Sequence, residues 1–248
     1  MSLYTGLDFF LILLIAMLPP VVLGLRGKNL RVCGLAVTAV MLLLIFDTWH
    51  SRVLLLAFWA WQSLLIFGYL RLRRRTAQRR LLWLMLLLSL VPLLLVKLSL
   101  WVEPLRVLSM LGVSYMSFRA VQILIEIYDG YLTELDFADV SYFILFFPSI
   151  SSGPLDRYRR FAADVHRTYT AEEYRVLLRD GLWRLMTGAF YSLVVGNLIW
   201  QYWLSPLPEG GFLPTLSYMY GYTFFMFFNF AGYSRMAVGT AYLLGVAQ

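Results

Sequence analysis

Long apolar runs separated by short polar segments dominate the first half of this chain. Five of them predict membrane-spanning helices, at residues 9–25, 32–46, 53–70, 81–100 and 105–128. Their lengths are of the order of the ~20 apolar residues that a helix needs to cross a bilayer. The pattern predicts an all-α, polytopic transmembrane protein in which residues 1–248 form a single membrane domain.

The pattern becomes less regular in the second half. The apolar run 142–150 is shorter than the ~20 residues of a span, and a dense polar cluster follows it at 151–161. Pro148, Gly153 and Pro154 oppose a continuous helix. Non-helical backbone at membrane depth has to be buried in protein or to line a watery cavity. We therefore predict a re-entrant segment lining a tunnel, with an ordinary loop at the membrane edge as the alternative.

Two longer helical stretches complete the chain. Thr170 and Glu173 have the spacing of a capping box and begin an interfacial amphipathic helix, which runs into a span ending near Leu204. Residues 216–246 are too long for one simple span, so we predict a broken or strongly tilted pair of helices there. Three positions are expected to interrupt this stretch: Asn229, Gly232 and Arg235.

The positions of the basic residues indicate membrane topology. The chain is 60% hydrophobic, which excludes an ordinary soluble globular protein, and its formal net charge is +7. Six arginines at 71–80 lie between two predicted spans, so a cytoplasmic loop is favoured over a nucleic-acid surface. With that loop inside, 16 of the 21 Lys and Arg residues lie on the cytoplasmic side. The N-terminus, Arg106 and the 205–214 turn are then expected outside.

Few residues could carry chemistry by themselves. Cys33 is the only cysteine, so neither an internal disulfide nor a cysteine-based metal site is expected. His50 and His166 are assigned ordinary surface roles, and two histidines seldom form a metal site. Hydrolase, zinc-protease and P-loop motifs are absent from the sequence. No cleavable signal peptide is expected, because the N-terminus lacks a basic segment.

Two charged residues lie inside the fifth apolar run. Arg119 and Glu126 are seven residues apart and hence on one face of a helix. Charges in a membrane interior are expensive and are usually paired or face a cavity. The spacing predicts either a buried ion pair, with each other or with other helices, or two residues that line a reaction tunnel.

Several segments resemble one known family. The stretch SSGPLDRYRRF at 151–161 is similar to the signature loop of the DltB-like D-alanyl transfer proteins of the membrane-bound O-acyltransferase (MBOAT) family. Residues 111–130, 210–215 and 228–234 resemble further segments of that family in the same order. The resemblance covers essentially the whole chain, as the N-terminal part of a longer family pattern.

This resemblance implies an acyltransferase. Such a protein moves D-alanine from the phosphopantetheine thioester of a carrier protein to an acceptor hydroxyl, such as that of teichoic acid or another cell-envelope polymer. The chain itself is expected to bind no cofactor. The family's catalytic histidine belongs to a C-terminal part that this sequence lacks, so no catalytic residue is assigned. Asn229 stands where the family commonly has an acid, and an amide loses that charge.

The resemblance and the charged positions together suggest which residues form the site. Candidates for the tunnel or substrate lining are Ser151, Ser152, Gly153, Pro154, Asp156, Arg157, Arg119, Glu126, Asn229 and Tyr233. Candidates for a surface that meets the carrier protein or anionic lipid are Arg159, Arg160, Arg175 and Arg179. Within the loop, Asp156 is expected to accept hydrogen bonds that hold the turn, and Arg157 to face the tunnel mouth. No metal site is expected.

The expected partners follow from the same resemblance. They are a D-alanyl carrier protein, a cell-envelope polymer or lipid-linked acceptor, membrane lipids and a complementing C-terminal polypeptide, and no nucleic acid. The expected location is the bacterial cytoplasmic membrane, with several spans and the N-terminus outside. Two other functions stay open at this point: a truncated, non-catalytic membrane scaffold, which the absent histidine favours, and an acetyltransferase for an exported polysaccharide.

Overall fold

A computed structural model of the protein describes residues 7–76, 78–99, 101, 102, 108, 110–208 and 210–247. Within these ranges the chain forms helices, turns and no strand, which confirms the all-α prediction. The helices are α1 (Leu7–Leu25), α2 (Arg31–Ile45), α3 (Trp49–Arg73), α4 (Arg79–Leu98), α5 (Val113–Tyr128), α6 (Phe137–Leu145), η2 (Phe147–Ser149), α7 (Tyr158–His166), α8 (Ala171–Ala189), η3 (Phe190–Gly196), α9 (Asn197–Ile199), η4 (Trp200–Leu204) and α10 (Phe212–Leu243).

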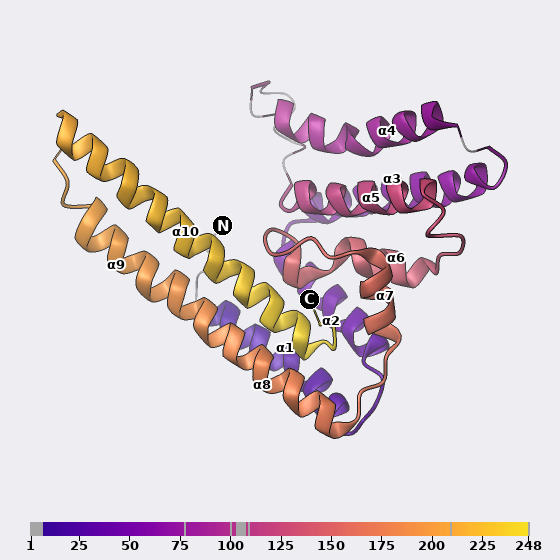
Figure 1. The fold of residues 1–248 in the computed structure, drawn as a ribbon, viewed down its shortest axis with the longest axis horizontal. Helices are drawn as coiled ribbons and strands as arrows, with labels where there is room; N and C mark the ends of the chain where they lie inside the picture. The colour runs from indigo at the N-terminus through magenta and orange to yellow at the C-terminus, as the bar shows by residue number, and fades with distance from the viewer. Residues whose placement is uncertain are drawn as a thin grey trace.

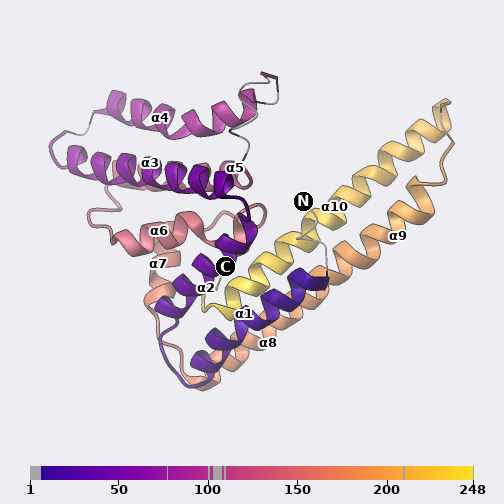
Figure 2. The same cartoon turned by 180° about the vertical axis from the view of Figure 1, so that it is seen from behind.

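The membrane character of the chain is confirmed by the length and apolarity of its helices. Within the described ranges, three helical stretches are long and apolar enough to cross a bilayer: α3, α4 and the continuous stretch Ala171–Leu204. Helices α3, α4 and α5 form a bundle in which each contacts the other two (Figure 1; Figure 2). Gln62 of α3 and Ser89 of α4 join two of them, because each donates a 2.8 Å hydrogen bond to the other residue.

The second part of the fold is a long hairpin that extends away from that bundle (Figure 1). It consists of α8, η3, α9 and η4 on one side and α10 on the other, with α1 packed along α8 (Figure 2). Glycines bring the two helices into backbone contact: a Cβ atom on Gly188 would lie 2.6 Å from the carbonyl oxygen of Gly232. The capping box of Thr170 and Glu173 at the start of α8 is confirmed.

The prediction of a broken helix pair at residues 216–246 is wrong, because α10 is one helix of 32 residues. Asn229 remains in the helix because its side-chain NH2 donates to the carbonyl of Phe225, while its amide oxygen accepts from Ser192 of η3. Gly232 and Arg235 also face the partner helix: Gly232 is a contact point, and Arg235 lies near the Thr187 hydroxyl, at 3.3 Å. These three positions contact the partner helix and do not interrupt α10.

The start of the fifth predicted span also differs. Helix α5 begins at Val113, because the preceding residue, Gly112, has a φ of +77° and so cannot belong to a right-handed helix. A Cβ atom on Gly112 would lie 2.7 Å from the carbonyl oxygen of Ile150, so glycine also permits close packing there. The outside positions predicted for Met1 and Arg106 lie beyond the described residues.

Helices α6 and α7 form a short hairpin around the loop at residues 151–157. Phe161 of α7 packs edge-to-face on three rings of α6 and its C-terminal end, with centroids 5.1–5.2 Å apart. Those rings belong to Tyr142, Phe143 and Phe146. Aromatic pairs of this geometry add about 0.5–1.5 kcal/mol each beyond their buried area. The middle of the hairpin is therefore firmly packed, and the loop projects from a rigid support.

Candidate functional site

The loop between η2 and α7 is the candidate site, and glycine determines its course. As predicted, residues 151–157 are not helical, and Gly153 has a φ of +114°, a conformation that other residues rarely adopt. A Cβ atom on Gly153 would lie 3.0 Å from the Cβ of Ala237 in α10 and 3.2 Å from that of Ser149. The loop thus passes close against α10 at this point.

A small cavity of about 90 Å³ lies beside the loop. The structure brings three of the predicted site residues together on its wall: Ser151 and Ser152 from the loop, and Tyr233 from α10. The rest of the wall is mainly apolar and comes from five elements of the fold, namely α1, α2, η2, α8 and α10. The hydroxyl groups in this apolar surrounding are the chemically useful groups of the cavity, because they can donate and accept hydrogen bonds.

Arg119 of α5 binds the segment from which the loop starts. Its guanidinium is buried and donates to the carbonyl oxygens of Phe143 at 3.0 Å, Ile144 at 3.2 Å and Ser149 at 2.6 Å. A fourth carbonyl, that of Phe146, lies at 3.4 Å. The last carbonyls of a helix lack partners within it. Arg119 supplies those partners for α6 and η2, and so fixes the point from which the loop starts.

Asp156 holds the far end of the loop. Its Oδ1 accepts a 2.8 Å hydrogen bond from the N–H of Arg157 and lies 3.9 Å from the Arg160 guanidinium. Its Oδ2 is buried and has no hydrogen-bond partner among the described residues. Burial raises the pKa of the Asp156 carboxyl, and the Arg157 N–H, Arg160 and Arg119 act in the opposite direction. The expected hydrogen bond from the loop backbone to Asp156 is present, and its role in holding the turn stays a prediction.

Other predicted site residues lie away from the cavity wall. Glu126 does not meet Arg119; its nearest cation is Arg159 of α7, with 3.7 Å between Arg159 Nε and Glu126 Oε2. The hypothesis of a direct Arg119–Glu126 pair is therefore wrong, because each residue has its own partners on other segments. Asn229 bonds to Ser192 in the α8–α10 hairpin. Pro154 and Arg157 are exposed, and the place of Arg157 at a tunnel mouth stays a prediction.

The four arginines expected on a partner-facing surface are all exposed. Arg159 lies over the ring of Tyr131, with its guanidinium carbon 4.3 Å from the ring centroid. Arg160 donates to the carbonyl of Ala247, which follows α10. Arg175 and Arg179 lie on the first turns of α8. Arg160 is therefore exposed and also contacts the segment that follows α10. The sequence did not predict this contact.

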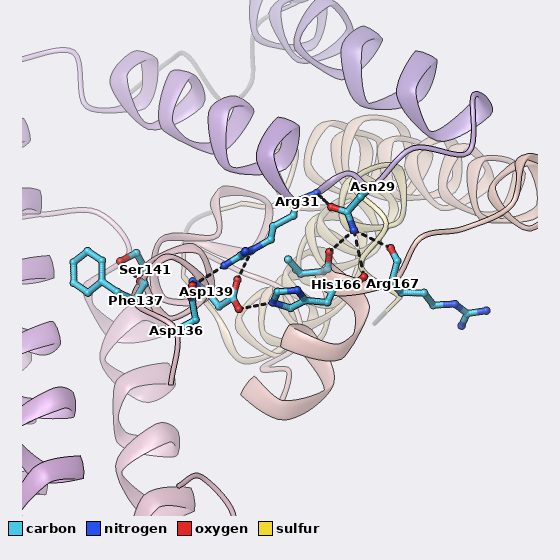
Figure 3. A network of polar contacts seen from close by, with 9 residues as sticks. Asn29, Arg31, Asp136, Phe137, Asp139, Ser141, His166 and Arg167 are labelled. Carbon is cyan, nitrogen blue, oxygen red and sulfur yellow. Dashed lines mark hydrogen bonds and ion pairs between the residues drawn. The ribbon is translucent and has the colours of Figure 1, made fainter. Parts of the chain in front are cut away.

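No histidine lines the cavity: neither His50 at the start of α3 nor His166 at the end of α7 belongs to its wall. His166 is exposed, as expected, and it also contacts a buried aspartate of α6, Asp139 (Figure 3). No cluster of metal-binding side chains occurs within the described ranges. The groups at the cavity could align an acyl donor or an acceptor hydroxyl, and they offer no strong general base.

Comparison with known proteins gives several curated relatives, while no family model matches. The chain is 39% identical to a teichoic acid D-alanyltransferase of Bacillus subtilis, over 99% of this chain and 65% of the relative. It is 34% identical to one of Lacticaseibacillus rhamnosus, over 98% and 64%. A probable alginate O-acetylase of Azotobacter vinelandii is 27% identical over 59% of this chain and 30% of its own length. These matches confirm the resemblance to the DltB-like proteins of the MBOAT family.

The chain spans a little under two thirds of the length of these D-alanyltransferases. The match extends over nearly all of the present sequence, so the loop, the cavity and the α8–α10 hairpin all lie within the shared part.

Proposed function

We propose, on its kinship with the DltB-like membrane O-acyltransferases, that this chain forms the N-terminal part of a D-alanyl transferase. It would take D-alanine from a carrier-protein thioester and pass it to a hydroxyl of teichoic acid or another cell-envelope polymer. The cavity beside the loop carries this proposal within the chain, because it places Ser151, Ser152 and Tyr233 together in an apolar surrounding. Exchanging a thioester for an ester needs little driving force, so the main tasks are alignment and the exclusion of water.

The general base for such a transfer would come from outside the described cavity wall. A histidine suits this role because its imidazole can accept a proton near neutral pH. We propose that it belongs to the part of the protein that corresponds to the remaining third of the relatives, packed against the loop and α10. Activity would then depend on both parts.

The carrier protein would dock on the basic side of α7 and α8. Arg157, Arg159, Arg175 and Arg179 are exposed there, and complementary charge steers an acidic partner toward such a surface. Contact with anionic lipid is the alternative use of the same arginines. A carrier-docking role predicts that transfer slows as salt concentration rises, because salt screens exposed charges.

The proposed orientation puts this basic side in the cytoplasm and the N-terminus outside. Arg184 and Trp203 lie near opposite ends of the apolar part of the helical stretch Ala171–Leu204, which is long and apolar enough to cross a bilayer. Tryptophan and tyrosine gather at the tip of the hairpin, as is typical of a membrane interface, and the basic residues lie at the other end.

Reconstituted transfer tests the proposal. The chain would be placed in lipid nanodiscs with a D-alanyl-loaded carrier protein and lipoteichoic acid, with and without a polypeptide that matches the last third of the Bacillus subtilis relative. We expect transfer only when both pieces are present. Gly153→Val should abolish it, because a β-branched residue cannot adopt the left-handed conformation beside α10. Leu155→Ala, on the exposed side of the same loop, should leave it nearly unchanged.

Two results would contradict this function. One is turnover by the chain alone that survives His50→Ala and His166→Ala. The other is normal transfer by the assembled Gly153→Val variant, which would make the loop a passive connection. Transfer of acetyl groups in place of D-alanine would support the second candidate, a polysaccharide O-acetyltransferase, which the match to the alginate O-acetylases favours.

A further inference from the structure

Two arginines and two tyrosines make crossed contacts between the helices of the long hairpin (Figure 1). Arg184 of α8 places its guanidinium carbon 5.0 Å from the ring centroid of Tyr242 on α10. Arg235 of α10 reaches in the other direction, with its guanidinium carbon 5.1 Å from the ring centroid of Tyr191 in η3. Arg235 also donates a hydrogen bond of 3.3 Å to the hydroxyl of Thr187. These five residues form the arginine edge of the hairpin.

The arginine edge is separate from the cavity beside the loop. The cavity wall includes Tyr233 and Thr240 of α10. Arg235 and Tyr242 each follow one of these residues by two positions. Two positions along an α-helix turn the side chain by about 200°, so both edge residues point away from the cavity. A ligand of the arginine edge therefore does not enter the site proposed for acyl transfer.

Neither arginine of this edge has an acidic partner among the residues that the structure describes. Asp180, four residues before Arg184, is the acid closest to it along α8, but Asp180 pairs with Arg179 at 3.0 Å. Arg235 has the hydroxyl and ring contacts given above, and no carboxylate of the described chain lies within ion-pair distance of it. A guanidinium carries five N–H donors, so most donors of both side chains are left for another molecule.

The position of the edge in the membrane makes an unpaired charge costly. All five edge residues are partly buried. Arg184 lies near the end of the apolar part of the stretch Ala171–Leu204, which is long and apolar enough to cross a bilayer. Arg235 contacts Thr187 and Tyr191, which are one and two turns further into that stretch, so Arg235 lies deeper than Arg184. Charges at such a depth are expensive unless they are paired, and the edge therefore favours an anionic ligand.

Exposed apolar side chains adjoin the arginine edge. Trp183, Met186 and Phe190 are 65%, 68% and 53% exposed. Each directly precedes an edge residue, and their spacing of three and four residues makes a stripe beside the one that carries Arg184 and Thr187. A phospholipid matches both surfaces, because its phosphate suits the guanidiniums and its acyl chains suit the apolar stripe. Inorganic phosphate or an acidic loop would match the guanidiniums alone.

We propose that the arginine edge binds the phosphate of an anionic phospholipid, at the membrane surface near the basic end of the hairpin. Basic pockets between membrane helices are typical sites for such headgroups. Each guanidinium can donate two parallel N–H bonds to phosphate oxygens, while a tyrosine ring holds its position. Since Arg184 and Arg235 come from opposite helices, the bound phosphate joins α8 to α10 and stabilises the hairpin.

Native mass spectrometry of the purified chain in detergent tests this site. The chain is titrated with phosphatidylglycerol, which is anionic, or with phosphatidylcholine, in which choline balances the charge of the same phosphate. We expect one phosphatidylglycerol to be retained at a lower lipid concentration than phosphatidylcholine. Arg184→Gln and Arg235→Gln should each weaken phosphatidylglycerol binding about tenfold, which is the effect expected from one lost hydrogen bond between charged groups.

Two further variants separate this site from general attraction and from misfolding. Arg71→Gln is the matched control, because it removes the same charge from an exposed arginine near the end of α3, and binding should stay nearly unchanged. Arg235→Lys keeps the charge without the forked donors, so its affinity should lie between those of the wild type and Arg235→Gln. Thermal unfolding without added lipid checks that each variant is folded.

Three results would overturn the lipid site. The first is equal affinity of the wild type for the two lipids, which would leave an acidic protein segment as the partner of these arginines. The second is binding of phosphatidylglycerol by both glutamine variants as in the wild type. The third is retention of added inorganic phosphate, dependent on both arginines, without retention of the lipid, which would assign the edge to a soluble anion. None of them affects the proposed transferase, because no acyl donor or acceptor takes part.

Discussion

Replacing Arg119 by methionine removes the support of the loop while keeping much of the side-chain volume. The change deletes the hydrogen bonds of a buried guanidinium to the carbonyls of Phe143, Ile144 and Ser149 and to the Ser149 hydroxyl. Hydrogen bonds to charged groups contribute about 1.5–3 kcal/mol each, and a carbonyl left buried without a partner costs a further amount. Since such terms are not additive, we expect a loss of about 4–5 kcal/mol of unfolding free energy, close to that of breaking a buried ion pair.

Thermal unfolding of the chain in nanodiscs measures this loss. For a chain of this size, 1 kcal/mol corresponds to roughly 2–4 °C, so Arg119→Met should lower the unfolding temperature by about 8–20 °C. Arg119→Lys should recover only part of it, because one ammonium cannot reach carbonyls that the two guanidinium nitrogens bond separately. A shift of only one or two degrees for Arg119→Met would refute the support that the structure assigns to this arginine.

Glu126→Gln is the matched control on the same helix. The residue lies two turns from Arg119, and among the described residues its carboxylate pairs with Arg159 at 3.7 Å. The Glu126 side chain is only 9% exposed, but its Oε2 accepts no hydrogen bond from any of these residues, so the neutral amide should change the unfolding free energy little. Because the two residues share no partner, the double variant should show the sum of the single effects within about 0.5 kcal/mol. A coupling above about 1 kcal/mol would restore the original hypothesis of a linked pair.

Three further predictions concern helix packing, topology and pH. Gly188→Ala should strongly lower the unfolding temperature, because its Cβ would meet a backbone oxygen of α10 at 2.6 Å; Gly68→Ala, with nothing within 4 Å, should have no destabilising effect. An impermeant maleimide added outside cells should label Ser205→Cys and not Thr76→Cys, and the reverse would overturn the orientation. Burial raises the pKa of the Asp156 carboxyl, so the native state favours the protonated form and the charge costs stability above that pKa. Asp156→Asn should therefore raise the unfolding temperature at pH 7.5, with the gain disappearing by about pH 4, and an equal gain at both pH values would refute this origin.

The parts of the fold that sequence predicted well are those determined by local pattern. Helix α3 extends a few residues beyond the apolar run 53–70, and α4 closely matches the run 81–100. Both agree with the prediction because charged residues limit those runs. The capping box at Thr170 and the non-helical turn at Gly153 were also predicted, since each depends on neighbouring residues alone.

The parts that sequence could not predict depend on contacts between distant segments. Asn229 and Gly232 look like helix breakers until α8 is placed beside them, where one bonds to Ser192 and the other allows close approach. The partners of Arg119 lie 24 to 30 residues further along the chain, so spacing within α5 suggested Glu126 instead. His166 is a surface residue as predicted, but nothing in its local sequence indicates its contact with a buried aspartate on α6.

The support of the loop comes from the α6–α7 hairpin and from α10. The hairpin is held at one end by Arg119, in its middle by the rings around Phe161, and at its other end by the contact of His166 with Asp139. The loop also passes against α10, because a Cβ atom on Gly153 would lie 3.0 Å from that of Ala237. Since Tyr233 on the opposite wall of the cavity belongs to the same helix, a change that moves α10 would alter the loop and the cavity together.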